Sequence, residues 1–230
     1  MTTTSGEARP HTPAQAWALM SQGNARFARG VSAHPHQSIQ TRASLARSQN
    51  PYAALFGCAD SRVGAEIIFD QGLGDLFVVR TAGHVVDPGV LGSLEFAVGV
   101  LHTPLIVVLA HTSCGAVRAT LDALRTHAIP QGFLRDIVER IAPSVLAAEA
   151  FGETSADDIG IIHLRHTVSR LAERSSLIRH RIEDGRLAVV VSCLRVGASV
   201  DEHFHNGQMP ACRRAHERRL ALARAYVRVG

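Results

Sequence analysis

Four short apolar runs alternate with segments of helical periodicity, and this alternation constrains the fold more than any other feature of the 230-residue chain. The runs cover residues 52–57, 76–80, 105–110 and 187–191, each the length of a buried strand. Apolar residues at helical spacing lie between them, as in residues 89–101. Because a helix between two strands carries the chain back across the sheet, such strands run parallel. The pattern predicts an α/β fold with a largely parallel central sheet flanked by helices.

Two clusters of chemically active side chains follow two of these runs. Cys58, Asp60 and Arg62 come after the first run, and His111 and Cys114 come after the third. The carboxyl ends of parallel strands meet at one edge of the sheet, where diverging loops leave a crevice, so both clusters are expected there. Two sulfurs and one imidazole suit zinc, and an aspartate oxygen can add a fourth ligand. The sequence therefore predicts a single zinc site.

Neither cluster is specific when it is taken alone. The spacing of His111 and Cys114 also fits one structural histidine beside one buried cysteine. Alternate residues of an extended segment point the same way, so Cys58, Asp60 and Arg62 can converge on one site. An arginine can hold an aspartate with two hydrogen bonds, and such a pair can also be purely structural. The two clusters together favour the metal site.

Composition argues against several other classes of function. The cysteines are too few for a disulfide framework and suit a reducing cytoplasm; they are Cys58, Cys114, Cys193 and Cys212. The net charge of +4 is spread along the chain and aromatic residues make up only 5%, which disfavours nucleic-acid binding. No apolar run approaches the roughly 18 residues of a membrane span. We expect a cytoplasmic protein that binds neither nucleic acid nor membranes.

The expected organisation is one catalytic domain with two appendages. Residues 1–12 lack the basic and apolar regions of a secretory signal and are predicted to be a disordered leader. Residues 13–206 form the domain. Residues 207–230 form a basic C-terminal tail in which arginines and apolar residues interleave, a pattern that fits a helix. The tail is interpreted as an exposed or subunit-packing segment, with a membrane or an acidic partner as the alternative.

The two clusters together resemble the signature of the β-class carbonic anhydrases, zinc enzymes that interconvert carbon dioxide and bicarbonate. That signature reads Cys-x-Asp-Ser-Arg and then His-x-x-Cys-Gly, which matches residues 58–62 and 111–115 here. The likeness also takes in Trp17 and residues 23–27, 34–37, 65–83 and 92–97. This breadth makes the resemblance far more specific than either cluster alone.

The resemblance implies one zinc ion per chain, with Cys58, His111 and Cys114 as permanent ligands. Asp60 then either fills the fourth position and closes the site, or pairs with Arg62 and admits water. In the open form, a zinc-bound hydroxide oriented by the Asp60–Arg62 dyad attacks carbon dioxide. The family members are oligomers with active sites at subunit interfaces, so a homodimer or homotetramer is also implied.

Other residues near the predicted site carry weaker expectations. Gln37 matches a family glutamine that reaches the substrate pocket, and it is expected to donate a hydrogen bond to the substrate. His84 follows the strand at 76–80 and is interpreted as structural rather than as a proton shuttle. His163 and His166 lie in a helical stretch and are expected at the surface.

Three other functions use the same residues. A related enzyme hydrolyses carbon disulfide or carbonyl sulfide with the same metal site. A zinc protein that Asp60 keeps closed would have a regulatory or binding role, but a purely structural site has no need of the Asp60–Arg62 pair. A thiol enzyme would use Cys58 or Cys114 as its nucleophile, which tight metal binding would exclude.

Overall fold

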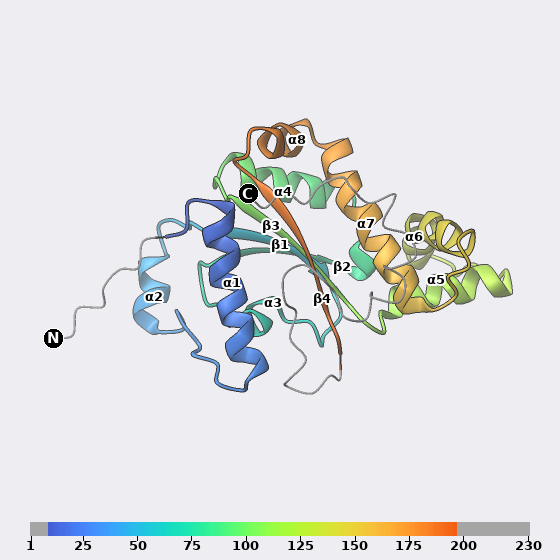
Figure 1. Ribbon diagram of the computed structural model, residues 1–230, viewed down its shortest axis with the longest axis horizontal. Coiled ribbons are helices and arrows are strands. Elements are labelled where there is room, and N and C mark those ends of the chain that lie inside the picture. Colours follow the sequence, from blue (N-terminus) through green and yellow to red (C-terminus); the bar gives the residue numbers. More distant parts are fainter. Residues whose placement is uncertain (1–8, 197–230) are drawn as a thin grey trace.

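The computed structural model describes residues 9–196, which fold around a four-stranded sheet (Figure 1). The strands are β1 (Ala53–Cys58), β2 (Leu76–Thr81), β3 (Leu105–His111) and β4 (Ala188–Leu194). Their order is β2-β1-β3-β4, and each neighbouring pair is parallel. The predicted α/β fold with a parallel central sheet is confirmed. Residues 1–8 of the expected leader and the basic tail at 207–230, which includes Cys212, lie outside the described residues.

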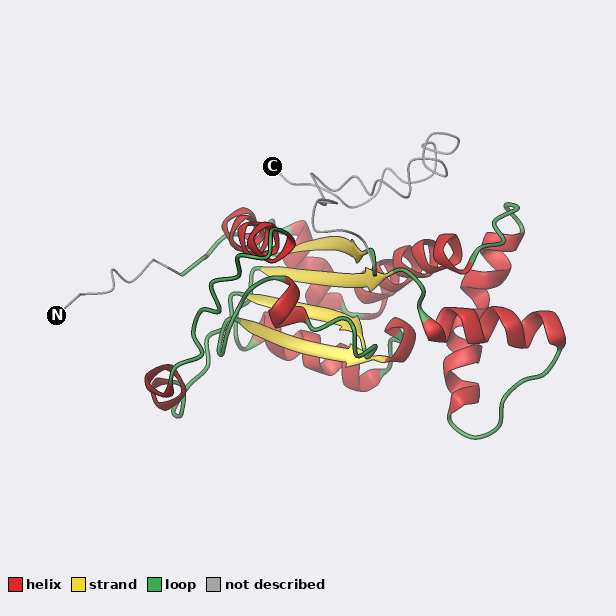
Figure 2. Ribbon diagram, turned by 90° about the horizontal axis from the view of Figure 1, so that it is seen from below, coloured by secondary structure: helices red, strands yellow, loops and turns green. Residues whose placement is uncertain are grey.

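Helices cover both faces of the sheet and extend beyond its carboxyl edge. They are α1 (Pro13–Ala28), α2 (Ile39–Ser44), α3 (Ala65–Ile68), α4 (Pro88–Gly99), α5 (Gly115–Thr126), α6 (Leu134–Glu149), α7 (Ala156–Arg174) and α8 (Ser176–Glu183). Helices α1 and α3 pack on one face, and α4, α7 and α8 pack on the other (Figure 1). Figure 2 shows the strand arrows pointing toward a further group of helices, which includes α5 and α6. Among residues 9–196, no helix combines the length and apolarity needed to cross a membrane.

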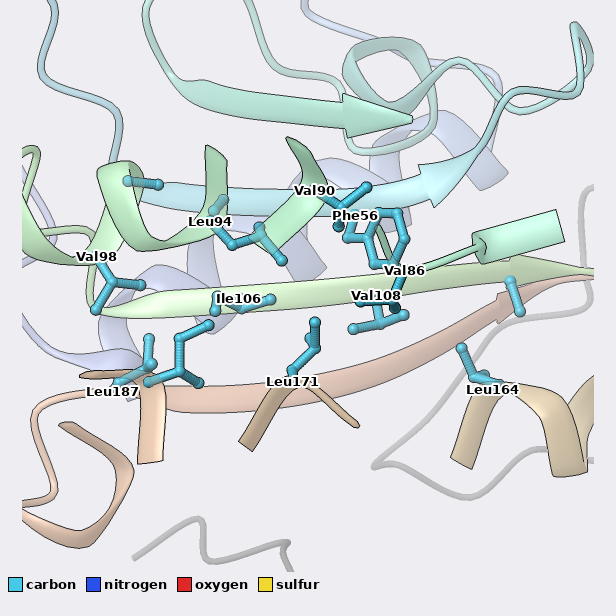
Figure 3. Close-up of a cluster of buried hydrophobic side chains, with 14 of the residues drawn as sticks. Phe56, Val86, Val90, Leu94, Val98, Ile106, Val108, Leu164, Leu171 and Leu187 are labelled. Atoms are coloured by element: carbon cyan, nitrogen blue, oxygen red, sulfur yellow. The ribbon is translucent and has the colours of Figure 1, made fainter. Parts of the chain in front are cut away.

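Each face of the sheet is buried in its own hydrophobic cluster, because successive strand residues point to opposite faces. On β3, Leu105 and Val107 pack with α1 and α3, whereas Ile106 and Val108 pack with α4 and α7. Figure 3 shows this second cluster, with Leu171 of α7 pointing toward the sheet. Complete burial of such a side chain stabilises the fold by about 1.5–3 kcal/mol. The two clusters therefore hold the strand ends in fixed positions.

The sequence pattern predicts a break at Pro143 within residues 133–151 and one long helix over residues 157–182, and the structure corrects both predictions. Helix α6 runs unbroken through Pro143, because Ile141 and Val145 are completely buried in a cluster with α5 and α7 and this packing outweighs the missing N–H. The stretch at 157–182 is divided into α7 and α8 at Ser175, whose backbone is extended. The Ser175 hydroxyl donates to Glu95 Oε1 at 2.6 Å and accepts from the first turn of α8. This capping starts a new helix.

Candidate metal centre

Strands β1 and β3 bring the three predicted metal ligands to one point at the carboxyl edge of the sheet. Cys58 ends β1, His111 ends β3, and Cys114 directly precedes α5. Gly57 pairs with Leu109, so the two strands end side by side. The three ligand atoms lie within 4.8 Å of one another, and the two sulfurs are 4.0 Å apart. All three residues are buried, so this is a compact internal cluster.

The imidazole of His111 is oriented as a metal ligand would be. Its Nδ1 lies 2.9 Å from the carbonyl oxygen of Thr112, which can only accept, so Nδ1 carries the hydrogen. Nε2 then holds the lone pair, and in the described part of the chain no hydrogen bond of good geometry reaches this buried atom, although the Cys58 thiol lies close enough to interact with the ring. A buried acceptor without a partner is costly. A metal ion bound at Nε2 would remove that cost, so the residues fit zinc.

Backbone N–H groups surround both sulfurs. The N–H groups of Asp60 and Gly83 donate to Cys58, and N–H groups in the first turn of α5 donate to Cys114. The hydrogen bond between the two sulfurs lowers the pKa of Cys58 and raises that of Cys114, as expected for two close thiols that share a proton. The N–H donors stabilise negative charge on each sulfur. The centre is therefore prepared for thiolate ligands.

Asp60 lies beside this cluster and is held by Arg62. The Arg62 Nε and Nη2 atoms donate to the two carboxylate oxygens at 2.9 and 2.7 Å. These hydrogen bonds hold the pKa of Asp60 well below its usual range. Asp60 Oδ2 is 3.9 Å from His111 Nε2, so the carboxylate borders the metal centre while it is paired with arginine. Arg62 also donates to the carbonyl oxygen of Ser113 at 3.2 Å, which links the two ligand loops.

Two further residues support the ligand loops, and sequence analysis did not identify them as site residues. Arg80 of β2 donates to the carbonyl oxygens of Cys58 and Asp60 at 2.8 and 2.6 Å. Asp157, in the first turn of α7, accepts from the N–H of Ser113 at 2.7 Å. Ser113 has a φ of 57°, a conformation that is uncommon outside glycine. A charge at the end of an apolar strand could have indicated Arg80, whereas no local pattern indicates Asp157.

The sequence and the fold of this chain are both similar to those of known carbonic anhydrases. The Carbonic anhydrase family matches residues 53–199. Carbonic anhydrase 2 of Mycobacterium tuberculosis is 56% identical over 182 residues, which cover 79% of this chain and 88% of that protein. A β-carbonic anhydrase structure from Aspergillus fumigatus has a TM-score of 0.62 at 23% identity, and the match covers 85% of this chain and 92% of that one. A structure from a study of two tetrameric β-carbonic anhydrases of Sordaria macrospora has a TM-score of 0.59 at 24% identity. That match covers 79% of this chain and 91% of the other. The chain belongs to the β-class carbonic anhydrases.

In this β-class carbonic anhydrase, Gln37 lies apart from the other predicted site residues. It is exposed in the loop before α2. The backbone carbonyl oxygen of the neighbouring His36 accepts from the N–H of Leu73 at 3.2 Å. The Nδ1 atom of the His36 ring lies 2.8 Å from Oδ2 of Asp75, which comes just before β2. The metal centre lies at the opposite, carboxyl edge of the sheet. Within residues 9–196, no described contact joins Gln37 to the centre of its own chain.

The histidines outside the centre divide into buried and exposed groups. His84 is buried, and its Nε2 donates to the carbonyl oxygen of Leu109 at 2.6 Å, which supports the structural interpretation. His163 is only 2% exposed, so its expected surface position is wrong. His166 is half-buried. The helical stretch therefore contributes polar groups to the interior, beneath the carboxyl edge of the sheet.

Proposed function

We propose that this carbonic anhydrase binds one zinc ion per chain and hydrates carbon dioxide reversibly to bicarbonate and a proton. One observation carries the proposal: the buried cluster of Cys58, His111 and Cys114, in which His111 Nε2 lacks a hydrogen-bond partner, borders the Asp60–Arg62 pair. Two sulfurs and a nitrogen form a donor set typical of zinc. The adjacent carboxylate supplies a group that can act on substrate water.

Cys58, His111 and Cys114 would hold the ion. Bound zinc supplies Lewis acidity, and in carbonic anhydrases that hold it with three histidines it lowers the pKa of a coordinated water to about 7. Two thiolates donate more negative charge than histidines do, which weakens that acidifying effect. The backbone N–H groups that donate to both sulfurs offset part of this charge. The protein thereby supports catalysis near neutral to alkaline pH.

Asp60 is suited to orient the attacking water because it is an ionised acceptor. The hydrogen bonds from Arg62 lower the pKa of Asp60. The carboxylate therefore stays ionised even at pH values well below the usual aspartate pKa of about 3.9. An ionised carboxylate can only accept, so it accepts a hydrogen bond from the water and leaves an oxygen lone pair directed at the carbon of carbon dioxide. Arg62 meanwhile keeps Asp60 from closing the centre. The released proton passes to buffer.

Stopped-flow measurement of carbon dioxide hydration across pH, on full-length protein of known zinc content, tests this function. We expect about one zinc per chain and activity that rises from acid to alkaline pH. The water must lose a proton to react, whereas Asp60 is already ionised. Activity lost in acid should return when the pH is raised again. Full zinc content without hydration at any pH would contradict the proposal and favour carbon disulfide, carbonyl sulfide or a closed site.

We further propose that Gln37 serves the site of a neighbouring copy in a homodimer or homotetramer. Gln37 is exposed in the loop before α2, away from the carboxyl edge of the sheet where its own metal centre lies, yet the family resemblance implies a role at a substrate pocket. The Sordaria macrospora enzymes of similar fold are tetrameric. A second chain is the arrangement that reconciles the exposed position with a role at a substrate pocket.

Mixing two impaired variants, assayed at a carbon dioxide concentration below KM, tests this assignment. Gln37→Ala should raise KM, and Asp60→Ala should lower kcat by about 10²–10⁴-fold. In a mixed oligomer, the intact Asp60 of one chain meets the intact Gln37 of the other, so mixing should restore activity above the average of the two variants. Gln40→Ala, an exposed glutamine three residues away, is the matched control and should behave like wild type. A monomer in solution, or mixtures that never exceed the average, would refute the shared site.

The cysteine chemistry supports a cytoplasmic location. Neither Cys58 nor Cys114 forms a disulfide, and both must be reduced to bind metal. The cytoplasm keeps thiols reduced. Cell fractionation with an antibody against the chain checks the location, and enrichment in an oxidising compartment would contradict it.

A further inference from the structure

A short turn, Ala82–His84, follows β2 and lies directly against the metal centre. The Gly83 N–H donates to Cys58 Sγ. Gly83 has a φ of 63° and His84 a φ of 56°, so two successive residues are left-handed. A Cβ at Gly83 would lie 2.6 Å from Ile141 Cδ1 and 2.8 Å from Ala116 Cβ. This backbone is uncommon and tightly enclosed, so surrounding groups must hold it in place.

His163 holds Gly83 through its carbonyl oxygen. It lies on α7 and is 2% exposed, and its Nε2 is 2.7 Å from the carbonyl oxygen of Gly83. Its Nδ1 is 2.9 Å from Ser144 Oγ on α6, and Ser144 is completely buried. The same hydroxyl is 2.9 Å from His166 Nδ1. Two imidazoles and one hydroxyl thus form a chain that ends at Gly83.

The direction of every hydrogen bond in this chain follows from its ends. The Gly83 carbonyl only accepts, so His163 Nε2 carries a hydrogen. Burial lowers the pKa of His163 to about 4, which keeps the ring neutral and leaves Nδ1 as an acceptor. Ser144 therefore donates its only hydrogen to His163. It must then accept from Nδ1–H of His166. The Gly83 carbonyl and the Ser144 hydroxyl together favour the tautomer of His163 in which Nε2 is the donor.

We propose that His163 and Ser144 are positioning residues for Cys58, because they hold Gly83 where its N–H reaches the sulfur. This inference rests on the zinc site of the proposed function. Loss of a partner behind a metal ligand weakens metal affinity by about 10–100-fold. Since His163 acts through Gly83 rather than on Cys58 itself, we expect the lower end of that range. Without the N–H donor, the transfer of an electron from the sulfur to a bound metal ion would also need less energy.

The test compares full-length variants by zinc dissociation constant, measured by competition with a chelator, and by the sulfur-to-metal charge-transfer band of the Co²⁺-loaded protein. His163→Leu should weaken zinc binding about tenfold and move the band to lower energy. His163→Gln, whose Nε2 can still donate to Gly83, should restore both. Thr167→Val, also buried on α7, is the matched control and should leave both unchanged. A merely structural role would lower stability without moving the band.

Ser144→Ala provides a milder variant in case His163→Leu does not fold. It removes only the hydroxyl and should move both readouts in the same direction by a smaller amount. Nitrogen NMR of the metal-free wild type should show hydrogen on Nε2, and not on Nδ1, of His163. If the wild type binds zinc and His163→Leu matches it in both readouts, or if Nδ1 carries the hydrogen, the positioning role is wrong. A wild type that binds neither metal would instead refute the proposed zinc site.

Discussion

Replacing Cys58 by serine or His111 by alanine should remove zinc and carbon dioxide hydration together. Each substitution deletes one of three ligand atoms that lie within 4.8 Å of one another, and the two that remain cannot define the site. Loss of an outer partner alone weakens metal binding by about 10–100-fold, so loss of a ligand should exceed about 100-fold. Metal analysis after gel filtration, followed by stopped-flow assay, measures both effects on the same samples.

Cys193→Ala is the matched control for the ligand variants. Cys193 is also a buried strand cysteine and pairs with Ala110 across β3 and β4, yet it does not belong to the cluster of three. This variant should keep about one zinc per chain and wild-type turnover. Thermal unfolding of each variant shows whether the fold is retained. Near-stoichiometric zinc in a folded Cys58→Ser protein would rule out the ligand assignment.

The place of the metal centre can be predicted from sequence because it depends on local patterns and one rule of topology. Apolar runs at 52–57 and 105–110 predict strands, and the helical segments between the runs require parallel pairing. Parallel strands end at the same edge, which brings Cys58, His111 and Cys114 together. The boundaries of β1 and β3 differ from the predicted ones by a single residue at most, because the apolar side chains that define a buried strand are visible in its own sequence.

The groups behind the centre cannot be predicted in this way, because they depend on how distant helices pack. A histidine in a polar helical stretch is typical of a surface, yet α7 turns His163 inward to reach Gly83, 80 residues away in sequence. Glycine weakens the interior of a helix, yet α1 is continuous through Gly23. A Cβ at Gly23 would lie 1.8 Å from the carbonyl oxygen of Phe69, so glycine permits a close approach between segments. The sequence shows that residue 23 is a glycine, but not that the backbone of Phe69 packs against it.

Asp60→Ala should leave zinc binding intact and lower kcat by about 10²–10⁴-fold, the usual contribution of a positioned acid–base group. Asp60 borders the centre but is paired with Arg62, so its loss removes the acceptor for the attacking water without removing a ligand of the buried cluster. Stopped-flow assay of zinc-loaded protein measures the effect. Asp136→Ala, an exposed acidic residue on α6, is the matched control and should retain full activity. Wild-type turnover by Asp60→Ala would eliminate this role.

Arg62→Leu separates the two members of the pair. Two hydrogen bonds from the guanidinium hold the carboxylate away from the centre, so without them Asp60 should occupy the position that water needs. The variant should retain zinc and lose activity to a similar extent. Because both residues act as one unit, the double variant should be no less active than Asp60→Ala alone. Independent, multiplicative losses in the double variant would mean that Arg62 acts on the substrate directly instead of through Asp60.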